Sequence, residues 1–384
     1  MAAVIGLDLF AVDLPFVVTF KHAAAARTTS DSVFLRVRLA DGATGWGECL
    51  PRGYVSGERR DETFALLRDT ILPGLLGREF ADLRDVTAFL EKCDGKAPAD
   101  WVAPEVPQTA AWCAVDLALL DAVGRATGEP VWPGSTSATR YSGVASAGRG
   151  WPAVRSLLLL RAYGFRQVKL KIGAEAAVGD ARTARRALGR RVDLRVDANM
   201  AWDVEQALSV IRDLRGLGIR SIEAPIAASD LAGLARLTAE SGAAIIVDEG
   251  FTDRDSLQAL INRRACTGVN VRISKCGGLV AAAARTREAL DAGLVLQVGC
   301  QVGESSLLSA AHVALLSTVA GRHPGVRYAE GCFGTHLLRE DPATPAVRFR
   351  FGGRAPRRPV GPGLGIAVDE AVLRRWAVGT VQIP

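Results

Sequence analysis

The stretch DLRVDANMAWDVEQALSVIRDLRGLGIRSIEAP, residues 193–225, contains one complete unit of the fold. A short apolar strand over 193–198 is followed by a segment with helical periodicity over 204–218 and by a second strand over 219–224. A strand, a helix and a strand in this order predict two parallel strands joined by a covering helix.

The same unit recurs from about residue 140 to residue 330. The predicted strands lie at 141–146, 168–172, 193–198, 219–224, 244–249, 268–274, 294–299 and 326–330. Strands separated by helix-forming stretches at this regular spacing favour a parallel barrel of the α/β class. An open doubly wound sheet is the alternative, but no glycine-rich phosphate loop follows the first strand, and polar residues end strand after strand.

The first 135 residues are organised differently. Residues 33–48, VFLRVRLADGATGWGE, alternate and turn at Asp41-Gly42 like an antiparallel hairpin, and residues 109–128 have a helical pattern that ends at a glycine. The Gly- and Pro-rich segment 348–370 is expected to leave the barrel and pack back on this first part. We therefore predict an α+β domain at 1–135, completed by 346–384, and a barrel domain at 136–345. No low-complexity linker separates the two, so we expect them to dock firmly.

Composition narrows the class of protein. The 384 residues are 49% hydrophobic, which is enough for a large core. The apolar N-terminus reads as a first strand rather than a signal peptide, because Asp8 and Asp13 interrupt it, and no apolar stretch is long enough to span a membrane. The seven cysteines are scattered and lack zinc-ligand spacing, which predicts a reducing, cytoplasmic compartment. The net charge of +6 is spread along helical segments, which is typical of a solvated face and does not predict a nucleic-acid partner.

Two lysines alternate with apolar residues in VKLKIG, residues 168–173. A parallel barrel strand contacts helices on one face and the barrel interior on the other, and residues two apart share a face. The apolar residues must contact the helices, so Lys169 and Lys171 are predicted to point into the barrel. An exposed amphipathic strand is the alternative for this stretch taken alone.

Three acidic residues end three consecutive predicted strands. Asp197, Glu223 and Asp248 are each about one βα unit apart, so they would lie side by side at the carboxyl-terminal mouth of the barrel. Converging carboxylates repel one another unless a cation compensates them, and all-oxygen ligation suits Mg²⁺. Any one of these acids alone could be a helix N-cap, but three in register with two inward lysines favour a metal site.

Lys275 ends the sixth predicted strand, almost across the barrel from Lys171. A substrate held on the metal would then have an amine base on each face. Removing a proton next to a carboxylate builds charge on that carboxylate as an enediolate, which a divalent cation stabilises. The ammonium of Lys169 would favour the neutral amine of Lys171, which a base requires.

These residues resemble the enolase superfamily, in its muconate-lactonizing-enzyme subgroup. The matching motifs are GWGE (45–48), KLK (169–171), DAN (197–199), EAP (223–225), DE (248–249) and Lys275 followed by Gly277-Gly278. The resemblance implies a modified TIM barrel, (β/α)₇β, with a capping domain. It also implies Mg²⁺ on Asp197, Glu223 and Asp248, an acid/base pair of Lys171 and Lys275, and Lys169 as their electrostatic partner. Asn199 and Glu249 would lie close to the metal, and a homo-oligomer is expected because members often assemble as dimers or octamers.

The resemblance implies a Mg²⁺-dependent isomerase that abstracts a proton α to a carboxylate. It would be a racemase or epimerase of an amino-acid derivative, or a cycloisomerase. The alternatives are a lyase, either a dehydratase or similar to o-succinylbenzoate synthase, and a catalytically silent ligand-binding barrel. Specificity for a small-molecule carboxylate is expected from the capping loops and the last two strands, whose candidate binding residues are Arg52, Tyr54, His22, Glu304 and Glu330.

The end of the eighth predicted strand departs from the patterns of the family. Dipeptide epimerases usually carry Asp-x-Asp there to hold the substrate ammonium, whereas this chain has Glu330-Gly331-Cys332. The following FGTHLLRED (333–341) resembles the FGPLLLxED of cycloisomerases, but the acidic residue of those enzymes falls on Gly331. We therefore expect L-Ala-D/L-Glu epimerisation to be disfavoured. His312, in a helical segment, is predicted to be a packed helix residue rather than a base.

Overall fold

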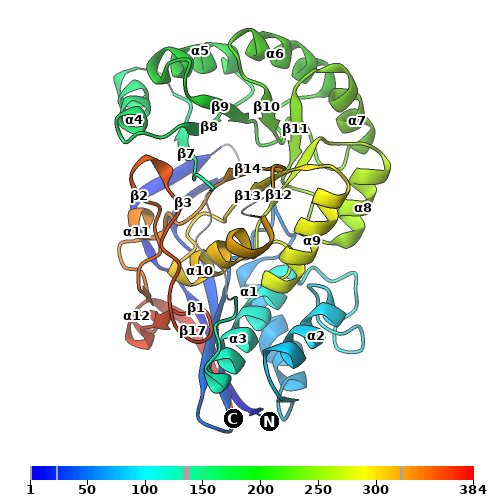
Figure 1. Ribbon diagram of the computed structural model, residues 1–384, viewed down its shortest axis with the longest axis vertical. Helices are drawn as coiled ribbons and strands as arrows, with labels where there is room; N and C mark the ends of the chain where they lie inside the picture. The colour runs from blue at the N-terminus through cyan, green and yellow to red at the C-terminus, as the bar shows by residue number, and fades with distance from the viewer. Residues whose placement is uncertain (1, 23–24, 133–138, 149, 321–322) are drawn as a thin grey trace.

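The computed structural model of the protein describes residues 2–22, 25–132, 139–148, 150–320 and 323–384. Within these ranges the chain forms a barrel of parallel strands surrounded by helices, and an antiparallel sheet with further helices beside it (Figure 1). The N- and C-terminal ends lie close together, at the end of the molecule away from helices α5 (Ala177–Leu188) and α6 (Val204–Gly216) of the barrel (Figure 1).

The barrel strands follow one another in sequence order, and every neighbouring pair is parallel. A parallel bridge between Tyr141 and Ala329 joins the first strand to the last, so the sheet closes on itself. The strands are β7 (Gly143–Ser146), β8 (Gln167–Lys171), β9 (Asp193–Asp197), β10 (Ser221–Glu223), β11 (Ala244–Val247), β12 (Gly268–Val271), β13 (Val295–Val298) and β14 (Val326–Ala329). The predicted α/β fold with a parallel barrel is confirmed.

Long helices follow each barrel strand except the last and cover the outside of the barrel (Figure 1), whereas β14 is followed by the four-residue α11 (Gly334–Leu337). In the described part of the chain they are α4 (Trp151–Ala162), α5 (Ala177–Leu188), α6 (Val204–Gly216), α7 (Leu231–Glu240), α8 (Arg254–Asn262), α9 (Leu279–Asp291) and α10 (Ser306–Leu315). This alternation is the predicted (β/α)₇β arrangement. None of the described helices is long and apolar enough to cross a membrane.

Helix α6 shows how the sequence determines where a barrel helix begins and which face it buries. The Asp203 side chain accepts a hydrogen bond from the Gln206 amide at 2.8 Å, and the Gln206 side chain accepts one from the Asp203 amide at 3.3 Å. This reciprocal cap satisfies amides that have no partner within the helix. The helix buries Ala207, Ile211 and Leu214, which are spaced along one face. The helix therefore begins at its polar cap, Asp203, and packs through its buried apolar face.

The capping sheet is antiparallel, with strand order β17-β1-β4-β5 and with β6 beside β1. The predicted hairpin over 33–48 is confirmed as β4 and β5, and its turn contains Gly42 with φ of 87°. Strand β17, near the C-terminus, pairs with β1, so the end of the chain returns to the first sheet. These strands are β1 (Ala2–Val12), β4 (Ser32–Leu39), β5 (Thr44–Cys49), β6 (Glu79–Phe80) and β17 (Ala377–Ile383).

The other elements surround this sheet and the mouth of the barrel. They are β2 (Pro15–His22), β3 (Ala25–Thr29), α1 (Arg60–Leu66), α2 (Leu83–Cys93), α3 (Thr109–Thr127), α11 (Gly334–Leu337), β15 (Ala343–Thr344), β16 (Ala367–Val368) and α12 (Glu370–Trp376). Strands β2 and β3 form a separate hairpin, and α11 packs beside β2.

The glycines of the GWGE motif let helix α3 pack directly on strand β5. A Cβ atom at Gly45 would lie 2.0 Å from the Ala122 amide nitrogen, and one at Gly47 would lie 1.9 Å from the Ala114 carbonyl oxygen. Both distances are far inside van der Waals contact, so any side chain at these positions would push the helix off the sheet.

Two buried carboxylates of the capping domain hold helix N-termini of the barrel. Glu48 accepts hydrogen bonds from the Ser305 amide at 3.0 Å and the Ser305 hydroxyl at 2.5 Å, just before α10. Asp116, in α3, accepts from the Leu279 amide at 2.7 Å and the Val280 amide at 3.3 Å, at the start of α9. These amides lack partners within their own helices, so the capping domain supplies the hydrogen-bond acceptors that the barrel helices need. Burial raises the pKa of each carboxyl to about 7.

Some strands are shorter than the sequence predicts. The strand predicted over 244–249 ends at Val247, and the one over 268–274 ends at Val271, so Asp248 and Lys275 lie in the turns that follow. The strand predicted over 219–224 begins at Ser221. These turns contain polar residues that are nevertheless buried, such as Asp248 at 1% and Lys275 at 0% exposure, so the sequence alone overestimates the length of these strands.

Candidate active site

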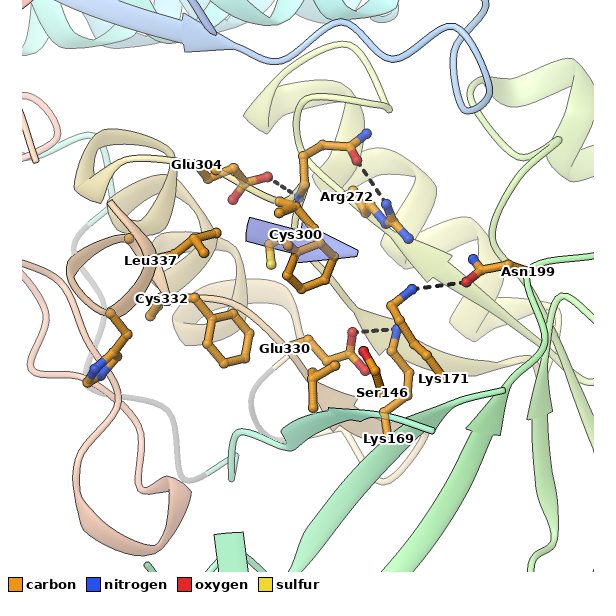
Figure 2. Close-up of a pocket in the computed structure, with 18 of the residues that line it drawn as sticks. Ser146, Lys169, Lys171, Asn199, Arg272, Cys300, Glu304, Glu330, Cys332 and Leu337 are labelled. Carbon is orange, nitrogen blue, oxygen red and sulfur yellow. Dashed lines mark hydrogen bonds and ion pairs between the residues drawn. The ribbon is translucent and has the colours of Figure 1, made fainter. Parts of the chain in front are cut away.

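The side chains at the carboxyl-terminal mouth come from neighbouring strands in matched register. Lys171 of β8 lies opposite Asp197 of β9, and Asp197 lies opposite Glu223 of β10. Residues two apart on a barrel strand share the inward face, which places Lys169 one layer below Lys171. Figure 2 shows the two lysines side by side at one end of a pocket.

Lys169 is buried among carboxylates. Its side chain is 3% exposed, and its ammonium lies 3.0 Å from Glu223, 3.5 Å from Asp197 and 2.7 Å from Glu330. Burial by itself lowers the pKa of Lys169, but Glu223, Glu330 and Asp197 outweigh it and hold that pKa above its usual value. Lys169 is therefore a permanent cation inside the barrel.

Lys171 reaches further toward the opening. Its side chain is 15% exposed, and its ammonium donates to Asp197 at 2.8 Å and to Asn199 at 3.2 Å. Burial alone would raise the pKa of Asp197, but Lys171 and Lys169 hold it well below its usual range, so Asp197 is a carboxylate. Lys171 is thus a cavity-lining amine fixed by two oxygen acceptors, of which Figure 2 shows Asn199.

Glu223 lies deeper, where all of its partners come from the barrel interior. Asn270 donates to one carboxylate oxygen at 2.9 Å, Gln297 donates to the other at 3.0 Å, and Lys169 completes the set. The structure therefore brings Asp197, Glu223 and the two lysines of the KLK motif together, as the sequence predicts.

Lys275 is arranged differently from the sequence expectation. It is 0% exposed and does not line the cavity. Its ammonium donates to the Asp248 carbonyl at 2.7 Å, the Asn270 carbonyl at 2.7 Å and the Asp248 carboxylate at 3.0 Å. Burial lowers the pKa of Lys275 to about 7. The buried Asp248 carboxylate requires a cation, and Lys275 together with Arg272 supplies it, so only Lys171 of the predicted pair faces the cavity.

One acidic residue of this cluster offers an oxygen to a divalent cation. No group of three or more His, Cys, Asp or Glu side chains within the described ranges is turned toward a common point, because each of the three predicted acids faces an ammonium or guanidinium. One oxygen of Glu249, however, is buried without any hydrogen-bond partner. Burial, and then the charges of Asp197 and Glu223, raise the pKa of Glu249. An unpartnered oxygen beside further carboxylates is the donor chemistry that Mg²⁺ takes.

A cavity of about 260 Å³ opens beside this cluster. Its polar end contains Lys169, Lys171 and Asn199, and its other end is lined by Cys332 and Leu337 (Figure 2). Phe333 also lines the cavity. The capping domain contributes Phe20 and Tyr54 to the lining of the cavity. A small carboxylate with an apolar extension matches this distribution of charge and apolar surface.

The predicted substrate-binding residues fall in different places. Tyr54, Glu304 and Glu330 line the cavity. Arg52 does not: it is 1% exposed, and its guanidinium donates to the Ser30 and Val302 carbonyls, which ties the capping loop to the loop after β13. His22 ends β2, but its side chain lies outside the described residues. His312 is 1% exposed and packs against Tyr141, as the sequence predicts.

Sequence reasoning missed two arginines of the site. Arg272 lines the cavity, binds Asp248 and donates to Gln301 at 2.9 Å. Arg195 is fully buried and binds Glu330. Arg195 lies two residues before Asp197, so the rule that alternate strand residues share a face could have placed it inside the barrel.

The fold and the site together define a capped α/β barrel with lysines and acids at its carboxyl-terminal mouth. A family model described as enolase C-terminal domain-like matches residues 153–372, and the model of the mandelate racemase / muconate lactonizing enzyme N-terminal domain matches residues 5–133. The chain belongs to the enolase superfamily, in its muconate-lactonizing-enzyme subgroup, as the motifs predict.

Characterised relatives match over nearly the whole chain. It is 25% identical to N-succinyl-L-Arg/Lys racemase of Bacillus cereus, over 97% of both chains. It is 28% identical to chloromuconate cycloisomerase of Cupriavidus pinatubonensis, over 97% of this chain and 98% of the relative. The structure of a dipeptide epimerase from Cytophaga hutchinsonii, complexed with Mg and a dipeptide, superposes with a TM-score of 0.85 at 22% identity, over 100% of both chains. The chain is an isomerase of this superfamily.

Proposed function

We propose that the protein is a Mg²⁺-dependent isomerase that removes the proton next to the carboxylate of a small organic acid, with Lys171 as the base. Its product would be a racemised or epimerised amino-acid derivative, or a cyclised acid. The observation that carries the proposal is the position of Lys171, which lines the cavity while Asp197 and Asn199 fix its amine. The names of the racemase and cycloisomerase relatives support the same class of reaction.

Asp197, Glu223 and Asp248 would hold the metal, with Asn199 and Glu249 beside it. A bound Mg²⁺ supplies positive charge next to the substrate carboxylate, where charge develops as the α-proton leaves. The unpartnered oxygen of Glu249 is the structural support for a cation at this place. Lys171 and Asp248 would have to exchange part of their present contacts for substrate and metal.

The two remaining lysines would have separate roles. Lys169 keeps its proton, so it supplies fixed positive charge beneath the substrate carboxylate. Lys275 would return a proton from the opposite side, after its hydrogen bond to the Asp248 carboxylate is released. The cover formed by Phe20 and Tyr54 would exclude water from the site.

Exchange of the α-proton in D₂O tests the proposal. In the presence of Mg²⁺ and a series of N-acyl amino acids and unsaturated acids, the proton NMR signal at the α-carbon should disappear only when the enzyme is present. Lys171→Met should lower the exchange rate by about 10³-fold, the usual contribution of a positioned base. Lys92→Met, at an exposed lysine of α2, is the matched control and should leave the rate unchanged.

Three results would contradict the proposal. Exchange that persists in Lys171→Met would show that another group takes the proton. Exchange that persists after the metal has been removed with a chelator would show that the reaction does not depend on Mg²⁺. Loss of water from the substrate, seen as a lower product mass, would assign the protein to the lyases instead. Homo-oligomeric assembly and the absence of a nucleic-acid partner stay predictions.

A further inference from the structure

The carboxyl group of Glu304 lines the cavity from the loop between β13 and α10. Glu304 is only 6% exposed. Figure 2 shows it on the opposite side of the pocket from Lys169 and Lys171. A substrate whose carboxylate lies against the two lysines could therefore meet Glu304 only with a part that is remote from that carboxylate.

The capping domain holds the loop on both sides of Glu304. Arg52 donates to the Val302 carbonyl at 3.0 Å, and the Ser305 amide donates to Glu48 at 3.0 Å. Arg52 and Glu48 are themselves buried. The position of Glu304 in the cavity wall is consequently fixed before a ligand binds, which is what a binding group requires.

Three carboxyl groups lie near the start of α10. Glu48 accepts hydrogen bonds from the amide and the hydroxyl of Ser305, and Asp341 accepts them from the amide and the hydroxyl of Ser306. Glu304 accepts a hydrogen bond from one backbone amide, at 2.6 Å. Hydrogen bonds stabilise the ionised form of a carboxyl, so Glu304 is the member of this group that is least stabilised as an anion.

The nearby cations are engaged elsewhere. Arg52 donates to backbone carbonyls, and Arg272 donates to the Gln301 side chain and to a carboxylate at the end of β11. Within the described ranges neither arginine forms an ion pair with Glu304. Burial raises the pKa of Glu304 to about 8, helped by the charge of Glu48 and opposed by the Gln301 amide and the two arginines.

The other titratable groups that act on Glu304 are thiols. Burial raises the pKa of Cys113, Cys300 and Cys332 above the usual value, so none of the three carries charge at pH 7. In the neutral Glu304 carboxyl, one oxygen accepts the Gln301 amide, and the proton lies on the other. No hydrogen bond within the described part of the chain reaches that second oxygen, so its hydroxyl can donate to a ligand in the cavity.

We propose that Glu304 determines specificity by keeping its proton and donating a hydrogen bond to an uncharged oxygen, such as a carbonyl, in the part of the substrate remote from its carboxylate. This inference rests on the proposed function, because it takes the substrate carboxylate to lie at the Lys171 end of the cavity. The donor is present at pH 7 and is lost as the pH rises through about 8, since an ionised carboxylate can only accept.

The ratio of two affinities at two pH values tests the proposal. The probes are unbranched keto acids, from levulinate upward, each with its ketone next to the terminal methyl group and each paired with the alkanoate of the same length. Dissociation constants are measured by calorimetry on the whole protein with saturating Mg²⁺. At pH 7 about nine-tenths of Glu304 is protonated, and the best keto acid should bind about five- to tenfold more tightly than its partner, the usual gain from one hydrogen bond.

At pH 9 only about one-tenth of Glu304 is protonated, so the ratio should fall below about two. Other groups that titrate in this range act on both members of a pair and cancel in the ratio. A wild-type ratio close to one at pH 7, an equal ratio at pH 9, or no binding of any keto acid would overturn the proposal.

Substitutions at Glu304 separate a donor from a merely structural residue. Glu304→Gln keeps an N–H donor that cannot ionise, so its ratio should stay at the pH 7 value at both pH values. Glu304→Met has no donor, and its ratio should be close to one throughout. A structural role would change both affinities of a pair alike. A ratio that still falls with pH in Glu304→Gln would assign the effect to another group and overturn the proposal.

Infrared spectroscopy detects the proton of Glu304 without any ligand. The C=O stretching band of a protonated carboxyl should disappear from the wild type between pH 7 and pH 9, and Glu304→Gln should lack this component. Glu48 and Asp116 have pKa values of about 7 and contribute to both proteins, so they cancel in the comparison. Identical difference spectra would show that Glu304 is already ionised at pH 7 and would overturn the proposal.

Failure of the proposed function would give a different result. Loss of the α-proton in D₂O reports catalysis, whereas the affinity ratio and the infrared band report only binding and protonation. A ratio that falls with pH, without exchange in any acid tested, would contradict the isomerase and leave Glu304 as a ligand donor. Exchange together with a ratio that does not change with pH would support the isomerase and overturn the role of Glu304.

Discussion

The Asp116 carboxyl makes the docking of the two domains sensitive to pH. Asp116 is 1% exposed and accepts the amides of Leu279 and Val280 at the start of α9. Burial raises its pKa from 3.8 to about 7, although the two amides act in the opposite direction. The folded protein therefore keeps this proton up to about pH 7, whereas the unfolded chain releases it near pH 4.

The sign and size of the effect follow from proton linkage. Because the folded state binds the proton more tightly, this contribution to stability is complete below pH 4 and is lost as the pH rises through 7. A shift of about three pH units corresponds to roughly 4 kcal/mol, of which about 3 kcal/mol is lost between pH 5 and pH 8. Asp116→Asn keeps an acceptor for the Leu279 amide and cannot ionise.

Urea unfolding, followed by tryptophan fluorescence at pH 5, 6, 7 and 8, measures this contribution. The free energy of unfolding of the wild type should fall across this range by about 3 kcal/mol more than that of Asp116→Asn. Asp121→Asn, at a second buried acid of the same helix, serves as a comparison because Asp121 does not contact α9. Parallel pH profiles for the wild type and Asp116→Asn would refute the reasoning, because burial would then not control this carboxyl.

Three further perturbations have defined outcomes. Lys169→Met leaves buried carboxylates without their ammonium and should lower the free energy of unfolding by about 3–5 kcal/mol in urea titration, and an unchanged midpoint would contradict the charge network. Gly45→Ala forces α3 away from β5 and should lower the free energy of unfolding by about 3 kcal/mol. In Gly42→Ala the added Cβ meets no atom within 4 Å, so the free energy of unfolding should fall by only about 1–2 kcal/mol because of the positive φ. Mg²⁺ at a hundred times its dissociation constant should stabilise the protein by about 2.7 kcal/mol, read as a higher melting temperature, and Glu249→Gln should reduce this gain.

The fold could be predicted from sequence because its signals are local and repeated. Each βα unit has its own strand and helix, as in residues 193–225, and the spacing of the units indicates the barrel. The ends of the strands were less predictable. The residues after Val247 and Val271 stay buried although they have left the sheet, and the sequence does not show where the hydrogen-bonded ladder stops.

The sequence predicts site residues that lie at the end of a strand. It does not predict contacts between residues that are far apart in the chain. Lys171 and Asp197 follow from alternation and spacing, and their contact is present. The pairing of Lys275 with Asp248 depends on how a turn folds under the capping domain, which no local pattern encodes. The same holds for Arg52, whose acceptors are carbonyls 22 and 250 residues away.

The buried charges of the barrel explain why the capping domain must dock so firmly. Lys169, Arg195, Glu223 and Glu330 occupy interior positions that apolar side chains usually fill, and each depends on its partner to offset the loss of water. Such a network tolerates little movement, because an ammonium or carboxylate that loses its partner in a dry interior costs several kcal/mol. Glu48 and Asp116 hold the capping domain on the N-terminal ends of α10 and α9. The docked capping domain keeps water away from these ion pairs. The carboxylates that hold the domains together thus protect the charges on which the proposed proton transfer depends.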